Sequence, residues 1–335
     1  VGSENVYKRQ NQYYEGWSNM NANEIFQNMI GSELEGLVVK YTPYNENFDV
    51  HPYRQSITTD FEKQFADLLF DSIIFYAFEK EEIEKDYIKG RFKDLRKASR
   101  AAYEMRVPKT EKECDGLFGE LALDSFLKCF FPNMEMLYSR VKYLERYPRK
   151  GADDKRSGHE VRGYDGLLFS CEDDKKYMWV GQVKTGSWKY CLDDIKKDIN
   201  KSILEHYFSS AMMILADIMK AVSCRSKNLL KIIDDLNDLI LEHSADKPLL
   251  HSKIVTYFKE ENITIRVPCL IIADEKSYSG EKTLLEIIKT KVKDSFDDFN
   301  IANDAGLNIE VLLLVFPVQN IGKIRSEFLG VRTKR

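Results

Sequence analysis

Apolar residues recur at helical spacing in several segments of the chain. In residues 58–78 they fall at Phe61, Phe65, Leu68 and Phe75, after a Thr/Asp pair that suits a helix start. This pattern predicts one helix there. The same reasoning predicts further helices over residues 89–106, 116–131, 191–222, 226–243 and 280–298.

Shorter apolar and alternating runs predict strands over residues 33–43, 163–171, 176–186, 267–274 and 308–318. The second and third are joined by a short polar turn and should form a hairpin. The last is apolar at nearly every position, as in a strand that is buried on both faces. Because strands alternate with helices, the fold class should be α/β.

The chain of 335 residues is long enough for one large domain or two ordinary ones. We expect residues 109–335 to form the main domain and residues 1–108 an α+β elaboration that contacts a partner or DNA. Whether this N-terminal region is a separate subdomain stays open. Its first 25 or so residues are polar and rich in Asn and Tyr, so they should be loosely ordered.

The net charge of −4 argues against a protein that binds polyanions through bulk charge, so any nucleic-acid surface must be a local patch. No apolar run is long enough to span a membrane, and the start of the chain lacks a signal-peptide pattern. The six cysteines show no zinc-like spacing and should be free thiols. These features predict a cytoplasmic protein with no membrane contact.

The chemistry is concentrated in the stretch VGQVKTG, residues 180–186. Because side chains alternate along a strand, Gln182 and Lys184 project from one face, together with Met178 and Val180. A lysine buried without a counterion is costly. Lys184 therefore either reaches solvent at the strand end or has acidic partners in a site.

Two carboxylates precede this strand. Glu120 lies on the apolar stripe of the helix over 116–131, where it must be paired, protonated or bound to metal. It could equally be a boundary residue in a salt bridge. Asp165 stands before a glycine at a strand start, where simple turn chemistry is the alternative.

Together, a helix carboxylate, an aspartate, a hairpin and then Gln-x-Lys form an order that suits phosphodiester hydrolysis. Acidic and amide oxygens are ligands for Mg²⁺ or Mn²⁺, and the lysine can stabilise developing charge. The sequence has no Gly-rich phosphate loop and no GxSxG elbow that would favour another α/β enzyme.

On these motifs the sequence resembles the PD-(D/E)xK nuclease superfamily, and within it the HamA family of the Hachiman anti-phage system. The likeness rests on GELALDSFL, RGYDGLLF and YMWVGQVKTG and covers roughly residues 110–330. It implies a mixed sheet flanked by helices, with Glu120, Asp165, Gln182 and Lys184 at the catalytic positions and the first three as metal ligands. It also implies DNA as substrate and a partner resembling HamB, a superfamily 2 helicase that restrains the nuclease.

One position departs from the family pattern, which has Glu where this chain has Gln182. A glutamine oxygen can still bind a metal, but the site loses one negative charge. Natural variation and a deliberate substitution are both open as its origin. The alternative to a working nuclease is therefore an inactive nuclease-fold subunit that binds DNA or protein.

Two basic segments could contact DNA. On the expected helix over 89–106, one face carries Lys89, Lys93, Arg96, Lys97 and Arg100. That face suits phosphates, a solvated surface or helicase docking equally well. The second segment, residues 140–150, interleaves tyrosines with cations that include Arg146 and Arg149, which suits single strands.

Overall fold

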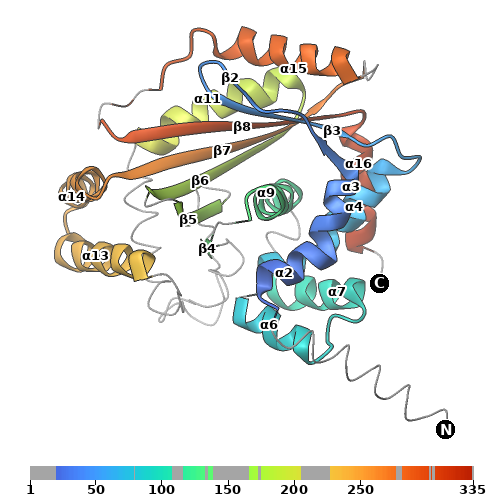
Figure 1. The fold of residues 1–335 in the computed structure, drawn as a ribbon, viewed down its shortest axis with the longest axis horizontal. Helices are drawn as coiled ribbons and strands as arrows, with labels where there is room; N and C mark the ends of the chain where they lie inside the picture. Colours follow the sequence, from blue (N-terminus) through green and yellow to red (C-terminus); the bar gives the residue numbers. More distant parts are fainter. Residues whose placement is uncertain are drawn as a thin grey trace.

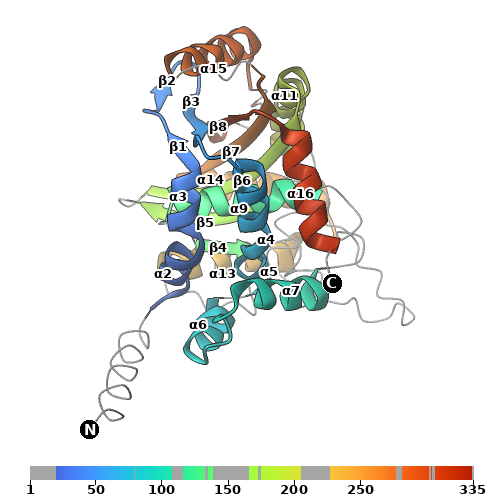
Figure 2. The same cartoon turned by 90° about the vertical axis from the view of Figure 1, so that its right-hand side faces the viewer.

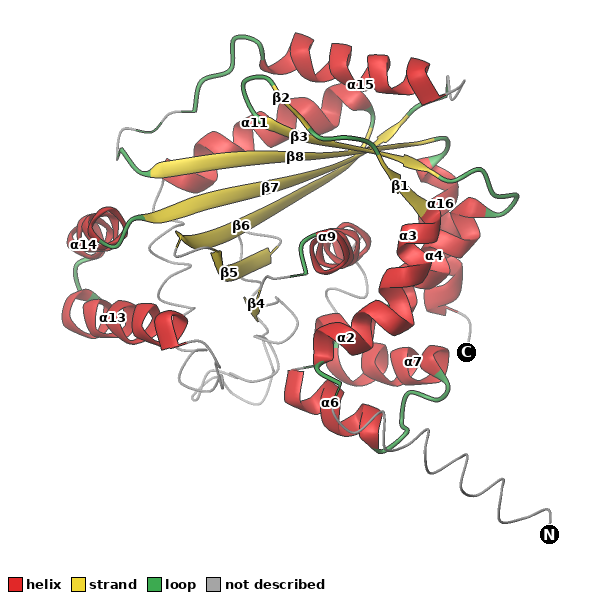
Figure 3. Cartoon of the chain, viewed as in Figure 1, coloured by secondary structure: helices red, strands yellow, loops and turns green. Residues whose placement is uncertain are grey.

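The structure is a computed structural model in which some segments are not described, and these are grey in Figure 3. The described residues are 20–78, 80–107, 116–132, 135–138, 166–172, 175–204, 227–276, 281–301, 303 and 306–333.

The strands of the described part form one mixed sheet of eight strands, in the order β1-β3-β8-β7-β6-β5-β4, with β2 paired to β3 (Figure 1). They are β1 (Val38–Lys40), β2 (Tyr44–Asn45), β3 (Asp49–Gln55), β4 (Glu135–Tyr138), β5 (Gly166–Glu172), β6 (Lys175–Gly186), β7 (Ile263–Asp274) and β8 (Asn308–Val318). The four strands β3, β8, β7 and β6 run parallel, and the remaining pairs are antiparallel. The predicted α/β class and the hairpin β5–β6 are confirmed.

Helices cover both faces of this sheet (Figure 2). The helices on one side are α2 (Ala22–Phe26), the π-helix Gln27–Gly31, α3 (Ser32–Leu37), α4 (Phe61–Asp71), α5 (Ile73–Ala77), α9 (Gly116–Phe130) and α16 (Ile321–Thr333). On the same side, α6 (Lys80–Ile88) and α7 (Leu95–Arg106) pack on other helices of this group. The other face packs against α11 (Trp188–Leu204), α13 (Lys227–His243), α14 (Lys247–Glu260) and α15 (Glu281–Phe296).

Alternation along β6 decides which side chains reach each core. Tyr177 and Trp179 belong to the core that contains α9, and Met178 and Val180 to the core that contains α11. In β8 the residues from Val311 onward are all buried, as predicted for a strand covered on both faces. Burial of these strands supplies much of the hydrophobic stabilisation of the fold.

The N-terminal region shares this sheet and core. Strand β3 pairs in parallel with β8, from Asp49 opposite Leu312 to Pro52 opposite Val315. Helix α4 contributes Phe61 and Phe65, whose rings contact Phe316 at centroid distances of 6.2 and 5.6 Å. The region is thus built into the sheet, whereas the domain boundary at 108/109 stays a prediction because residues 108–115 are not described.

Several expected elements are wrong in extent. Residues 33–37 end helix α3, so only Val38–Lys40 of the expected strand over 33–43 is a strand. The helix expected over 58–78 is divided at Ser72 into α4 and α5, and Asp60 forms no side-chain cap. Of the helix expected over 191–222, the part to Leu204 is confirmed as α11, and its end stays a prediction because residues 205–226 lie outside the described part.

The largest error concerns the helix expected over 89–106. Helix α6 ends at Ile88, and a turn with Gly90 at φ +67° leads to α7, which begins at Leu95. Asp94 caps α7 by accepting from the backbone N–H of Lys97 at 3.0 Å. A capping aspartate and a glycine in the left-handed region both stop a helix, and the pattern of charges hides them.

The structure also tests the predictions about free cysteines and membrane-spanning helices. In the described part, Cys129, Cys171, Cys191 and Cys269 form no disulfide, as expected. Cys114 and Cys224 lie outside it. None of the helices in the described ranges combines the length and the apolar character that spanning a bilayer needs.

Candidate active site

Gln182 and Lys184 lie in the inner strand β6, opposite Cys269 and Ile271 of the parallel neighbour β7. Gln182 is only 4% exposed, so its amide is a buried polar group that must be satisfied. Val183, between them, packs into the core that contains α9. Alternation therefore directs Gln182 and Lys184 toward the α11 side, and the prediction that they share one face is confirmed.

Lys184 has a counterion on that side. Its Nζ lies 2.5 Å from Oδ2 of Asp198 on α11, and both side chains are partly shielded from water. The ion pair explains how a lysine is accommodated near the middle of a sheet. The ion pair also fixes the ammonium at the strand end, where a negatively charged group of a substrate could contact it beside Asp198.

Helix α9 approaches the same stretch of β6 from the opposite face. A Cβ on Gly119 would lie 3.1 Å from Cγ1 of Val183 and 3.8 Å from Cγ2 of Thr185. A side chain at position 119 would press on Val183, so glycine suits this close approach of helix and strand. The second turn of α9 is thereby held against the residues that flank Lys184.

Glu120 follows this glycine and is 1% exposed. Its Oε2 accepts a hydrogen bond of 2.5 Å from the hydroxyl of Tyr76 on α5. Farther along α9, the buried Asp124 pairs with Lys128 at 2.7 Å, and Lys128 also donates to the carbonyl of Phe75. Residues 120, 124 and 128 thus form a polar stripe that α9 presents to α5.

The four predicted site residues are brought together only in part. Gln182 and Lys184 share one face of β6, and Glu120 comes from the helix on the other face. Asp165 lies outside the described residues, although Gly166, to which it is bonded, lies opposite Gly181. The described residues contain no group of three or more His, Cys, Asp and Glu side chains placed for a metal. The oxygens of Glu120 and Gln182 are of the type that Mg²⁺ binds. Because Asp165, the third predicted ligand, is not described, the metal site stays a prediction.

A family model decides the relationship of the chain to known proteins. The model of the HamA family matches residues 38–330, which includes β1 at one end and most of α16 at the other. The chain belongs to the HamA family. Membership implies a role in Hachiman antiviral defence and, with it, a partner. No curated protein and no solved structure matches the chain significantly.

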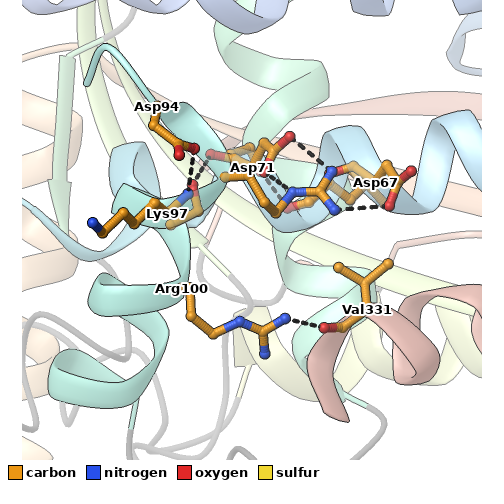
Figure 4. A network of polar contacts seen from close by, with 10 residues as sticks. Asp67, Asp71, Asp94, Lys97, Arg100 and Val331 are labelled. Carbon is orange, nitrogen blue, oxygen red and sulfur yellow. Dashed lines mark hydrogen bonds and ion pairs between the residues drawn. The ribbon is translucent and has the colours of Figure 1, made fainter. Parts of the chain in front are cut away.

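In this HamA-family chain, two of the predicted DNA contacts are occupied by the protein itself (Figure 4). Arg96 donates to both carboxylate oxygens of Asp71, at 2.5 and 2.9 Å, and to Asp67 at 3.0 Å. Burial raises the pKa of Asp71 in spite of this arginine. Arg100 donates to the carbonyls of Val331 and Arg332 and so satisfies the C-terminal end of α16. The continuous basic face is therefore wrong.

The remaining predicted DNA contacts have different positions. Lys89 and Lys93 lie in the turn before α7, and Lys97 lies in its first turn; all three are exposed. Arg146 and Arg149 lie outside the described residues. Binding of DNA by any of these five side chains stays a prediction.

The structure adds three residues to the surroundings of β6 that sequence reasoning missed. They are Tyr76 beside Glu120, Asp198 beside Lys184, and Arg325 on α16, which donates to the carbonyl of Thr185 at 3.0 Å and to its hydroxyl. In the described part Arg325 forms no ion pair with a carboxylate. All three contacts join segments far apart in the chain, and no local pattern signals them.

Proposed function

We propose that this HamA-family protein is a metal-dependent DNA nuclease that acts as the effector of a Hachiman defence complex. The supporting observation is the end of β6, where Gln182 and Lys184 share one face and α9 closes against the strand through Gly119. In the proposal, Asp165 and Gln182 hold Mg²⁺ or Mn²⁺, and the predicted ligand role of Glu120 requires its carboxylate to reach past the end of β6 from the opposite face. When bound, the metal would polarise the scissile phosphate and lower the pKa of a water.

Lys184 would act on the phosphodiester itself. Its ammonium is held by Asp198 and can stabilise the charge that develops on the phosphate oxygens. Asp198 is then a positioning residue, because it orients the lysine and keeps a counterion beside it. Oε2 of Glu120 accepts a hydrogen bond from the hydroxyl of Tyr76, so metal binding by this carboxylate would have to coexist with that contact.

The experiment is cleavage of plasmid and linear DNA in the presence and absence of Mg²⁺ or Mn²⁺. Lys184→Ala should abolish cleavage, and Gln182→Glu should raise it, because a restored charge tightens metal binding. Lys189→Ala, which removes an exposed lysine at the start of α11, is the matched control and should cleave like the parent. If Lys184→Ala cleaves as fast as Lys189→Ala, the site is assigned wrongly.

The second candidate is a nuclease-fold subunit that binds DNA or protein without cutting. The observation that favours it is Gln182 itself, a neutral and buried side chain at a metal position. Calorimetry with Mg²⁺ separates the two functions. A nuclease should show a divalent-metal site that Asp165→Asn removes, and a non-cutting subunit should show no such heat.

The partner in this proposal is a helicase of superfamily 2, which would restrain the nuclease until DNA is sensed. Co-purification of the two proteins, followed by cleavage assays with and without the helicase, tests this part. Lower cleavage in the complex than in the free protein is the expected result.

A further inference from the structure

A groove of about 690 Å³ runs between α6 and α7, remote in sequence from the residues of the proposed active site. We call it the α6–α7 groove. Its volume lies within the range of protein clefts that bind ligands. Helix α7 is amphipathic, and both helices pack on the core through residues such as Ile83 and Tyr103.

The floor of the groove is apolar. Phe92, Ala98, Ala101, Ala102 and Met105 line it, and Met105 is 73% exposed. A solvent-exposed methionine beside small apolar side chains is typical of protein-docking surfaces. Phe92 is buried, and the ring of Phe78, which also lines the groove, is covered by the guanidinium of Arg106 at 4.9 Å. The floor therefore offers no open aromatic face for stacking a base.

The rim of the groove is basic in a chain whose net charge is −4. Its three carboxylates are engaged: Asp86 with Arg91 at 2.8 Å, Glu82 with Arg106 at 3.0 Å, and Asp94 with the N-terminus of α7. Lys85, Lys89 and Lys97 have no ion pair in the described part of the chain. Lys97 points away from the Arg96–Asp71 network in Figure 4.

We propose that the α6–α7 groove binds an acidic amphipathic helix of the partner protein. Apolar side chains of that helix would cover Met105 and the alanines, and its carboxylates would meet Lys85, Lys89 and Lys97. The charge of the rim selects an acidic occupant, and the apolar floor favours a protein over a nucleic acid. This inference rests on the proposed function only in assuming that the protein works with a partner.

The first probes are two fluorescent peptides of about 18 residues, long enough to form a helix in a groove. Both contain the same leucines and glutamates, and only one arranges the leucines on a single face. Fluorescence anisotropy with the full chain should show binding about ten-fold tighter for the amphipathic peptide. Met105→Glu, which puts a charge on the floor, should remove this preference, as should a Lys89→Glu/Lys97→Glu variant.

Leu241→Glu is the matched control, since Leu241 on α13 is 68% exposed and lies outside the groove. It should bind both peptides like the parent, and thermal unfolding should show that all variants are folded. Equal binding of the two peptides, or equal losses in Met105→Glu and Leu241→Glu, would overturn the proposal. The proposal would also be overturned if the groove variants lowered the affinity for a single-stranded DNA of about 20 nucleotides and left peptide binding unchanged. The groove would then be a nucleic-acid site.

DNA cleavage keeps this proposal separate from the nuclease proposal. Met105→Glu should leave metal-dependent cleavage by the isolated chain unchanged, because Glu120, Asp165, Gln182 and Lys184 do not line the groove and Met105 is not a predicted DNA contact. If no variant and no parent protein cleaves DNA, the nuclease proposal fails while the peptide result still decides the role of the groove.

Discussion

At the scale of single residues, Glu120 and Tyr76 form a pair whose role can be separated into structure and chemistry. The hydroxyl of Tyr76 satisfies one oxygen of a carboxylate that is almost completely buried. A buried carboxylate without such a donor is costly. The pair thus stabilises the contact between α9 and α5 whether or not Glu120 also binds a metal.

Tyr76→Phe should lower the free energy of unfolding by about 1–3 kcal/mol, because it leaves a buried carboxylate oxygen without its donor. Unfolding in urea measures this. Tyr190→Phe, at a tyrosine that is 51% exposed, is the control and should have almost no effect. Equal unfolding midpoints for the two variants would mean that the hydroxyl does not support Glu120.

Glu120→Gln distinguishes the two roles of the carboxylate itself. It keeps the shape and one acceptor, so a structural role predicts a folded protein with unchanged cleavage. A role as metal ligand predicts a folded protein whose cleavage needs a much higher Mg²⁺ concentration, by about ten-fold or more. Cleavage measured across a Mg²⁺ titration decides between them.

Buried thiols give the protein an alkaline pH dependence. Burial raises the pKa of Cys129 and of Cys191 from 9.0 to about 12. Their protonated forms therefore contribute stability that is complete below about pH 9 and is lost as the pH rises toward 12. The slope approaches about 1.4 kcal/mol per pH unit for each thiol.

Unfolding in urea from pH 8 to pH 11 should show this loss, and a Cys129→Ala/Cys191→Ala variant should show a shallower one. In the folded protein at pH 8, a thiol reagent should modify the exposed Cys171 and leave Cys129 and Cys191 unmodified. Rapid labelling of all three would contradict the assigned burial.

At the scale of elements, the turn between α6 and α7 changes what the basic residues do. The change of direction at Gly90 and the cap at Asp94 turn Arg96 and Arg100 toward α4 and α16. Lys89 and Lys97 are left on the rim of the groove. The same side chains would face one way on a continuous helix, and the break divides them into structural arginines and exposed lysines.

Arg96→Gln should therefore destabilise the protein by about 1–3 kcal/mol, because it leaves the partly buried Asp71 without its bidentate partner. It should leave DNA binding within error of the parent, in contrast to the sequence-based prediction. Chemical unfolding and a salt titration of DNA affinity measure the two effects. Lys97→Gln serves as the control for stability and should unfold like the parent.

The sequence predicts local features of the site well and its long-range partners not at all. The period of two along β6 places Gln182 and Lys184 correctly on one face, and the period of the helix over 116–131 buries Glu120. Asp198 and Arg325 are invisible in the same pattern, since their contacts form only when α11 and α16 pack on the sheet.

The same limit explains the missed elements. Strand β3 contains Pro52 and several polar residues, and its place in the sheet comes from pairing with β8. Helix α14 is an exception, because Asp246 as cap and a proline in its first turn are local signals that predict its start. Helix α16 owes its start to Asn320 and to the distant Asp274, whose carboxylate accepts from Ile321 N–H at 2.7 Å.

At the scale of the whole molecule, the sheet joins the two ends of the chain. The predicted C-terminal domain, residues 109–335, lacks β1 and β3, which complete one side of the sheet beyond β8. It also lacks α4, whose phenylalanines cover Phe316. The family match from residue 38 to residue 330 covers both parts.

A fragment of residues 109–335 should accordingly fail to fold cooperatively. Its β8 edge and the apolar surface around Phe316 would be open to water and to other chains. Size-exclusion chromatography and thermal unfolding, with the full chain as control, measure this. A monomeric fragment with a sharp unfolding transition would establish that the N-terminal region is dispensable for folding.

The pairing of β3 with β8 also determines when the sheet can form during translation. More than three quarters of the chain lies between Asp49 and its partner Leu312, so β3 leaves the ribosome long before β8 exists. At about 5–20 residues per second the wait is on the order of tens of seconds. The proposed nuclease would thus complete its sheet only near the end of translation. Limited proteolysis of ribosome-bound chains of increasing length should show β3 protected only after β8 has emerged.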